Sequence, residues 1–590
     1  NAANGTLTNM DAATDWVAST AFNTWFGGES SAWSTAANWS TGAMPTASDN
    51  VGVYKWDMGN ELNVSSTVNT GSMIISANSN PTIDAAINTT GQIIPLRNVN
   101  LKLTTNNSIG SVTNPSGNEL IIPADAKVTV STDILNEGKI ILKSTDTNAA
   151  QIKNTGSTTT PGTVILRKDL KATSGWYFIS FPFDVAFANI KKTSTQTAVT
   201  IGDFKTATGP AYDDLYIIEY NGARRDATGT TAVTNSPNWD AVTTGPLLAK
   251  KGYAILVKSD IEIDFIGTTN SDMFANADKS TTIIDNHSNA SSIHHGWNLV
   301  GIPFTTAFDI ANLSQGTYFY VYDQNSQTYI VKQKSVDNYQ LNPFGAFFMQ
   351  ASNANLTFAN AGRALKAPSA VNMPEYSQID LNISNGTFSD KAQIRFMQGA
   401  LNDYELNIDA AKILSLNSSV PQLWSKAQTF DVAINALPET TTEVALGMRI
   451  GIAGNYIIKL NNATQNQTAI LVDNSNGNRI NLNEQNSYTF NVTTTGTITN
   501  RFKIVTKPDI NTFISETNQA AIKITSLKAG FTITGLTGNA TVKLIDMTGK
   551  IIAIFNNVQN NSFYKSDYKG AVIYNITDNL NTCNIKSFGR

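Results

Sequence analysis

Apolar and polar residues alternate along most of this chain. The alternation has a period of two in segments such as 128–130, 139–142, 163–166, 261–265, 456–460 and 540–545. Each segment lies between clusters of Gly, Asn, Asp, Ser or Pro, which favour turns. Many short strands with such turns are typical of an all-β protein. A helical pattern is limited to part of 401–414, so we expect a chain made almost entirely of strands.

One nine-residue pattern occurs twice, as GWYFISFPF at 175–183 and as GWNLVGIPF at 296–304. In both copies a Tyr-rich strand, a Gly-led strand and a Phe-containing strand follow in the same order. This repetition predicts two β-modules that arose by duplication. Trp176 and Trp297 would anchor the cores, and Pro182 and Pro303 would end the strands, because proline cannot donate to a ladder. The alternative is that the repeated pattern binds a ligand.

Three tryptophans, Trp25, Trp33 and Trp39, lie among small polar residues near the N-terminus. Short apolar segments separated by Asn and Gly follow as far as about residue 144. This opening resembles that of many large Bacteroidetes surface proteins, in which it leads into a short β-solenoid-like region. The indoles would either cover the first rung, since Trp carries a large apolar area, or be exposed and stack on glycans.

Tyr318, Tyr320 and Tyr322 alternate along one predicted strand and therefore share one face of it. Three phenol rings on one face could form a platform for sugars. They could equally form the half-buried face of a sheet. Both interpretations stay open at this stage.

Two C-terminal stretches resemble parts of proteins exported by the type IX secretion system. Residues 366–510 resemble the β-sandwich that often precedes the sorting domain in those proteins. In the last stretch, VKLIDMTGKII resembles the sorting-domain hairpin through Asp546, Gly549 and Lys550, and Lys569–Gly570 matches a later strand. The resemblance implies that the last domain directs the chain to the outer-membrane translocon and adds no activity.

These patterns predict tandem β-sandwich-like modules after an N-terminal β-solenoid-like region, with a small β-sandwich sorting domain at the end. We expect the following domains: an N-terminal arm (1–21), a Trp-rich solenoid-like domain (22–170), a first module (171–285), a second module (286–366), a β-sandwich (367–510) and a sorting-like domain (511–590). The arm lacks a core pattern. It would be either a flexible leader or a strand donated to a neighbouring subunit.

The composition of the chain excludes some classes of function. Only 15% of the 590 residues are charged and the net charge is −4, so no basic field is available to hold nucleic acid. No apolar run is long enough to span a bilayer as a helix. The chain begins at Asn1, which we interpret as the start of a mature chain after signal-peptide removal.

Candidate catalytic chemistry is sparse. The single cysteine, Cys583, excludes an intrachain disulfide and a CxxC zinc site, and the three histidines (His287, His294 and His295) form no HExxH motif. There is no Gly-x-Ser-x-Gly elbow and no P-loop. We therefore expect no enzyme activity and no cofactor, although the Asp-containing turns leave room for structural Ca²⁺. His294 and His295 would lie in a surface turn; the alternative is a transition-metal site built from His287 and this pair.

The sequence favours a secreted, surface-associated structural protein that assembles into a fibre, surface layer or matrix. Expected partners are copies of itself, neighbouring surface proteins and, during export, the type IX translocon. The alternative is an adhesin that binds glycans through Trp25, Trp33 and Trp39 or through Tyr318, Tyr320 and Tyr322. A hydrolase is a third and weaker alternative, since paired carboxylates can come together only in the folded chain.

Overall fold

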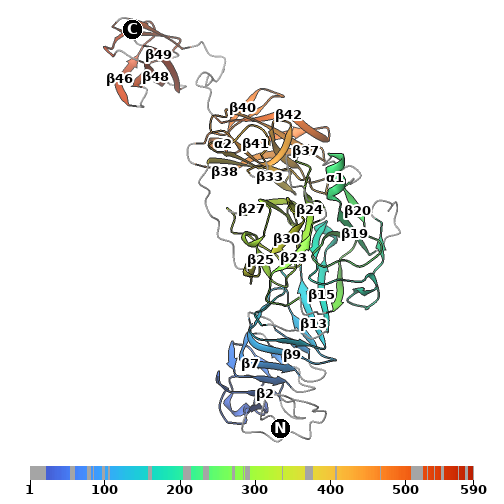
Figure 1. Ribbon diagram of the computed structural model, residues 1–590. Helices are drawn as coiled ribbons and strands as arrows, with labels where there is room; N and C mark the ends of the chain where they lie inside the picture. The colour runs from blue at the N-terminus through green and yellow to red at the C-terminus, as the bar shows by residue number, and fades with distance from the viewer. Residues whose placement is uncertain are drawn as a thin grey trace. The chain divides into compact units, whose positions relative to one another are not determined.

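The computed structural model shows a chain that is nearly all β, as the sequence pattern predicts (Figure 1). It folds into two compact units, residues 1–507 and 508–590. No helix in the described part of the chain is long and apolar enough to cross a membrane. The structure describes residues 22–588 except for 54–59, 76–80, 84, 96–99, 104–106, 157–161, 204–213, 230–237, 269–272, 284, 286–292, 335, 366–376, 406–407, 465–466, 507–521, 528, 537, 547–549, 569–570 and 578–581.

The N-terminal part of the first unit is a β-solenoid. Its strands pair in parallel, and partners such as Ile109 and Val130 lie roughly 20 positions apart, the length of one rung. Inward side chains of every rung are buried in one continuous core. The first sheet contains β1 (Asn23–Trp25), β2 (Val51–Val53), β4 (Val68–Thr70), β5 (Met73–Ile75), β7 (Ile87–Pro95), β9 (Asn107–Asn114), β11 (Lys127–Val130), β12 (Ile134–Asn136) and β14 (Gln151–Asn154).

Buried asparagines connect successive rungs. Asn114 Nδ2 donates to Asn136 Oδ1 over 2.8 Å, and Asn136 Nδ2 donates to the Thr163 carbonyl over 3.2 Å. Asn118 Nδ2 donates to the Pro95 carbonyl over 2.8 Å. A buried amide must find such partners, because an unpaired polar group costs about 1–3 kcal/mol. The Asn residues between the rungs therefore serve as internal hydrogen-bonding groups of the solenoid.

A second sheet of the solenoid continues without a break into the first module. The strands β8 (Asn100–Lys102), β10 (Glu119–Ile122), β13 (Lys139–Ser144) and β15 (Thr163–Leu170) are parallel. β22 (Ile261–Thr268) then adds antiparallel to β15 along its whole length, and β17 (Ile190–Lys192) adds to β22. The expected boundary at residue 170 is therefore crossed by a hydrogen-bonded sheet. A small parallel pair, β3 (Asn63–Val64) and β6 (Thr82–Ile83), completes the solenoid.

The two modules have the same strand order, which confirms the predicted repeat. In each sheet the Gly-Trp strand pairs with the Gly-led strand, which pairs with the Tyr-rich strand, which pairs with the strand after it. Module 1 has β16 (Tyr177–Ser180), β21 (Gly252–Val257), β19 (Leu215–Tyr220), β20 (Trp239–Ala241) and β18 (Ile201–Gly202). Module 2 has β24 (Trp297–Gly301), β29 (Ala346–Gln350), β26 (Tyr318–Asp323) and β27 (Thr328–Gln333), with β25 (Ala307–Asp309), β28 (Gln340–Leu341), β30 (Asn355–Phe358) and β31 (Arg363–Ala364) beside them. β23 (Lys279–Thr282) comes before the expected border at 286 but pairs with β30 of module 2.

The repeated Gly-Trp pair has a conformational reason. Gly175 and Gly296 have φ values of +71° and +73°, a region that glycine enters at low cost. A Cβ at Gly296 would lie 2.4 Å from the Ala351 carbonyl oxygen. The tryptophans that follow, Trp176 and Trp297, are 5% and 0% exposed, so both are core anchors as predicted. β16 and β24 end at residues 180 and 301, before each proline.

The modules also bind each other reciprocally. The Ser180 amide donates to the Phe344 carbonyl over 2.8 Å, and the equivalent Gly301 amide donates to the Lys250 carbonyl over 2.9 Å. Lys250 and Phe344 both have positive φ values, +67° and +61°, directly before their strands. The two modules are thus joined by the same pair of backbone contacts in both directions.

In the β-sandwich a polar cluster around the buried Asp473 links strands that lie far apart in the sheet order. Asp473 accepts bonds from the Arg501 guanidinium (3.0 Å) and from Tyr488 Oη (3.1 Å), which joins strands at opposite ends of the sheet. Its strands are β32 (Ser377–Ser384), β33 (Ser389–Phe396), β34 (Ala410–Ala411), β35 (Gln422–Ala427), β36 (Phe430–Leu437), β37 (Glu443–Ile450), β38 (Gly454–Ala463), β39 (Ile470–Asp473), β40 (Asn478–Asn481), β41 (Ser487–Val492) and β42 (Gly496–Val505), with the short helix α2 (Leu482–Gln485).

The prediction of a helix within 401–414 is wrong. The described residues of this stretch hold turns and the bridge-forming strand β34, which pairs with β36. Asp409 accepts bonds from the Ala436 and Glu405 amides (2.6 and 2.7 Å), and these fix an irregular backbone there. In the described residues α-helix is confined to α1 (Gly222–Thr228) and α2.

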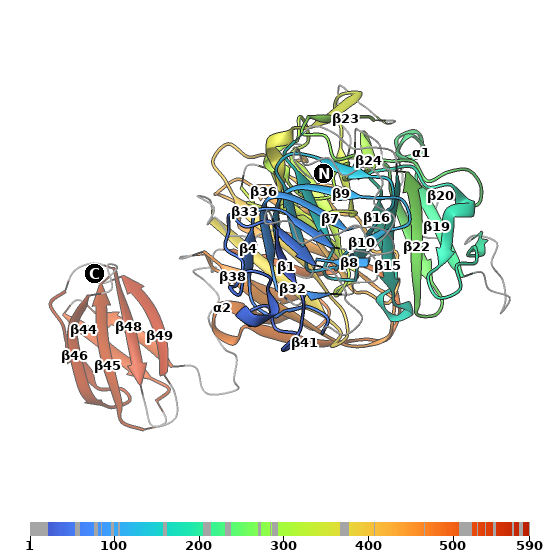
Figure 2. The same cartoon turned by 90° about the horizontal axis from the view of Figure 1, so that it is seen from below.

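The second unit is a small two-sheet sandwich (Figure 2). One sheet holds β43 (Lys523–Leu527), β44 (Gly530–Thr534) and β47 (Phe563–Lys565). The other holds β46 (Ile551–Val558), β45 (Ala540–Asp546), β48 (Ala571–Thr577) and β49 (Thr582–Phe588). Phe531, Val542 and Ile576 are fully buried between the sheets.

Candidate functional site

The three N-terminal tryptophans form a cap over the first strand of the solenoid. Trp25, Trp33 and Trp39 are 2%, 6% and 2% exposed. Trp39 packs edge-on against both others, at ring distances of 5.1 and 4.6 Å, and its Nε1 donates to the Trp33 carbonyl. Glycan stacking needs an open ring face, and these rings have none, so the structure favours the capping alternative.

The tyrosine face of β26 is likewise covered. Tyr318, Tyr320 and Tyr322 are 5%, 2% and 9% exposed. They belong to an aromatic cluster, here called the shared cluster, to which both modules and the sandwich contribute. Trp297 lies 5.0 Å from the Tyr320 ring, and Tyr318 Oη donates to the Ile408 carbonyl of the sandwich. An open platform for sugars is therefore not formed by this face.

The sorting-like motif falls partly outside the described residues. Asp546 and Lys550 form the predicted hairpin: the Asp546 amide donates to the Lys550 carbonyl over 2.9 Å, and the Lys550 amide donates to Asp546 Oδ1 over 3.0 Å. Gly549, Lys569 and Gly570 lie outside the described residues. Asp546 thus binds across the end of the β45–β46 pair through both its amide and its carboxylate.

The histidines do not come together as a metal site within the described ranges, where no group of three or more His, Cys, Asp or Glu could hold an ion. His295 Nδ1 contacts Asp226 of α1. Burial lowers the pKa of His294 to about 4, so its imidazole is neutral at physiological pH. His287 and the side chain of Cys583 lie outside what the structure describes.

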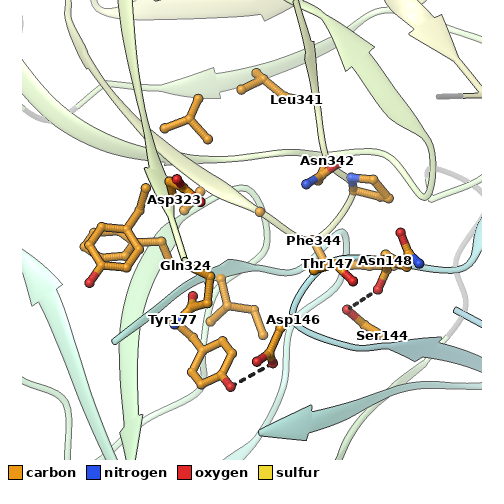
Figure 3. A pocket seen from close by; sticks show the side chains of 18 of the residues that line it. Ser144, Asp146, Thr147, Asn148, Tyr177, Asp323, Gln324, Leu341, Asn342 and Phe344 are labelled. Carbon is orange, nitrogen blue, oxygen red and sulfur yellow. Dashed lines mark hydrogen bonds between the residues drawn. The ribbon is translucent and has the colours of Figure 1, made fainter. Parts of the chain in front are cut away.

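The strongest candidate site is a cleft that sequence reasoning missed, here called the junction cleft (Figure 3). It has a volume of about 270 Å³ and lies where the solenoid meets both modules. Its walls come from the solenoid turn 144–149, from β16, and from the turns that follow β26 and β28. Residues this far apart in the chain carry no shared sequence signal, because only the packing of three domains brings them together.

A partly buried polar cluster forms one wall of the junction cleft. Asp146 Oδ1 accepts from Tyr177 Oη over 2.8 Å, and its Oδ2 accepts from Ser174 Oγ over 2.6 Å. The buried Lys168 donates to Ser144 Oγ over 3.2 Å and to the Thr145 carbonyl. Burial lowers the pKa of Lys168 to about 8 and raises that of Tyr177. Tyr177 therefore stays protonated and donates to the carboxylate.

Residues 312–505 match a domain of unknown function, DUF8693. A search of curated proteins found no match to the chain. The matched segment begins inside module 2 and ends with the sandwich. It therefore includes both sides of the shared cluster's contact between module 2 and the sandwich. The DUF8693 segment also supplies one wall of the junction cleft through Asp323, Gln324 and Asn342, whereas the solenoid, module 1 and Ile302 of module 2 supply the rest.

Chemically, the junction cleft can accept and donate hydrogen bonds, because carboxylates, amides and the Lys168 side chain line it. Its two carboxylates come from different domains, Asp146 from the solenoid and Asp323 from module 2, and each accepts hydrogen bonds from nearby donors. Asp323 accepts from Ser326 Oγ over 2.8 Å and from the Asn325 amide over 3.1 Å. The arrangement is that of a small polar binding site.

Proposed function

We propose that this chain is a secreted, surface-associated structural protein without enzyme activity, which assembles into a fibre, surface layer or matrix. The observation that carries this proposal is the continuity of the first unit. One hydrogen-bonded sheet runs from the solenoid into module 1, and one aromatic cluster joins both modules to the sandwich. Because a sheet and a cluster of buried side chains cross these borders, the described residues on either side are held together, as a structural subunit requires.

Specific buried bonds secure each border. Thr305 Oγ1 of module 2 donates to the Ile152 carbonyl of the last solenoid rung over 2.7 Å. Arg363, 4% exposed, donates to the Asn154 carbonyl over 2.8 Å. These contacts are typical of domains that stay together, because separating them would leave buried donors and acceptors unpaired.

Module 2 and the sandwich are joined in the same way. Thr328 Oγ1 donates to Asp390 over 3.1 Å, and the Asp390 carboxylate also binds Lys412. Arg395 donates to Gln333 over 2.6 Å and to Tyr318 Oη over 3.3 Å. Polar groups from both domains therefore satisfy one another inside the border, which supports a single rigid body.

Export by a type IX translocon is part of the proposal. Its support is the resemblance of the second unit to sorting domains and the Asp546–Lys550 hairpin within it. Such a domain would direct the chain to the cell surface. The small net charge of −4 weakens repulsion between copies once they are there.

Electron microscopy of the native protein, isolated without denaturant, tests the proposal. We expect filaments or a regular lattice. The matched control is the same chain lacking residues 1–21, which we expect to remain dispersed because the N-terminal arm would supply the joint between copies. Dispersed particles from the complete chain, at the concentrations found on the cell surface, would overturn the structural assignment.

A further inference from the structure

The junction cleft combines a polar rim with an apolar floor. The rim carries Asp146 from the solenoid, Asp323 from the end of β26, Gln324 from the turn that follows, and Asn342 from the turn before β29 (Figure 3). An ionised carboxylate has about four acceptor positions. Asp146 and Asp323 each use two of these for local bonds. Acceptor capacity therefore remains on both sides of the cleft.

The floor that a ligand can reach is aliphatic. Val321 and Ile330, which lie opposite each other on β26 and β27, line the cleft; Ile330 is 38% exposed and Val321 is half-buried. Ile179, Ile302, Leu341 and Phe344 also line the cleft, but they are at most 3% exposed and serve as packing. A ligand for this cleft needs an apolar face toward the floor and hydrogen-bond donors around its edge. A sugar ring has this distribution, with C–H groups on its faces and hydroxyl groups on its perimeter.

We propose that the junction cleft binds a short neutral saccharide, with hydroxyl groups donating to Asp146 and Asp323 and a ring face on the aliphatic floor. The volume of about 270 Å³ is slightly below the range of about 300–1,000 Å³ for drug-sized ligands, which limits the ligand to a mono- or disaccharide. The inference concerns recognition and is independent of whether the chain assembles into filaments.

The rim discriminates against two other ligand classes. The two carboxylates outnumber the one cation of the lining, Lys168, so the cleft disfavours an acidic sugar, since like charges repel within a few ångströms. A bare divalent cation could bind the carboxylates, but it would make no contact with the apolar floor. Tyr177 is a positioning residue here: its hydroxyl, which accepts from the Lys171 amide over 2.7 Å, orients the Asp146 carboxylate.

Saturation-transfer NMR on the complete chain tests the proposal with glucose, galactose, mannose, N-acetylglucosamine and cellobiose as probes. Glucuronic acid and CaCl₂ are tested in parallel. Thr147→Trp fills the cleft from its exposed rim, and the matched control Thr494→Trp places the same side chain on an exposed bend of the sandwich. Asn148→Ala is a second rim variant, for use if Thr147→Trp lowers the melting temperature.

We expect at least one neutral sugar to bind, with affinity at least tenfold weaker in Thr147→Trp and unchanged in Thr494→Trp. Asn148→Ala should weaken binding several-fold. Absence of binding by all five neutral sugars would overturn the proposal. So would equal binding by the wild-type and rim variants, tighter binding of glucuronic acid, or competition in which Ca²⁺ alone occupies the cleft.

Discussion

Replacing Trp297 by alanine removes the centre of the shared cluster. Trp297 is fully buried, and its Nε1 donates to the Ile293 carbonyl over 2.7 Å. The Arg225 guanidinium lies 4.2 Å from the indole, and the Tyr320 ring lies 5.0 Å away. The substitution therefore deletes a large side chain, a buried hydrogen bond and a cation–π contact at once.

The expected cost follows from these contacts. A buried Trp→Ala change costs about 3–5 kcal/mol. A desolvated cation–π contact contributes about a further 1–2 kcal/mol. We expect the free energy of unfolding around the cluster to fall by about 5 kcal/mol, which corresponds to a several-thousandfold larger population of the open state.

Hydrogen exchange followed by mass spectrometry measures where that loss appears. Because both modules and the sandwich share the cluster, exchange should accelerate in β19 and β21 of module 1 and in β35 and β36 of the sandwich, as well as in module 2. The control is Ile330→Ala on β27, where the side chain is 38% exposed and the cost should stay below about 1 kcal/mol. Acceleration confined to 286–366 would refute the argument that these domains form one cooperative body.

Three further substitutions test single contacts. Burial raises the pKa of Asp409 to about 6. The folded protein therefore binds this proton more tightly than the unfolded chain does, and the stability gained from it is full below pH ~4 and is lost as pH rises through 6. The unfolding free energy of Asp409→Asn relative to wild type should therefore increase by about 2 kcal/mol between pH 4 and pH 7 in urea titrations, and a flat difference would contradict this. Gly296→Ala meets a carbonyl at φ +73° and should cost more than about 2 kcal/mol, whereas Gly399→Ala, at φ +83° in open space, should cost about 1 kcal/mol, so equal melting temperatures would contradict the steric argument. Thr305→Val leaves the Ile152 carbonyl without its donor and should cost about 1–2 kcal/mol. Thr306→Val should be neutral, because the buried Thr306 hydroxyl has no partner in the described structure; equal losses would argue against the border contact.

The local sequence pattern was sufficient to predict the fold class and the repeated module. Period-two alternation is a property of each strand, so it survives whatever the strand packs against. The Gly-Trp pairs were predictable as core strands because the glycine is needed by the backbone and the tryptophan by the core. The helix considered for 401–414 failed because the Asp409 carboxylate binds the Ala436 amide, a contact between residues far apart in the chain.

Whether an aromatic residue is exposed cannot be read from its neighbours in the chain. Trp33 and Tyr320 have the same sequence context whether they bind sugars or fill a core, and burial by other domains decides between these roles. The junction cleft escaped prediction for a related reason. Asp146 and Asp323 are ordinary turn residues in the sequence and face one cleft only after three domains pack.

The sequence by itself determined that this protein is an all-β chain with a duplicated module, because strand periodicity, turn residues and repetition are local properties. Only the tertiary structure decided that the solenoid, the two modules and the sandwich form one body, that the three N-terminal tryptophans are buried, and that a polar cleft lies at the junction. Those features arise from contacts between residues separated by up to hundreds of positions, such as Lys153 with the Arg363 carbonyl. Their energies depend on burial, which is a property of the packed molecule as a whole.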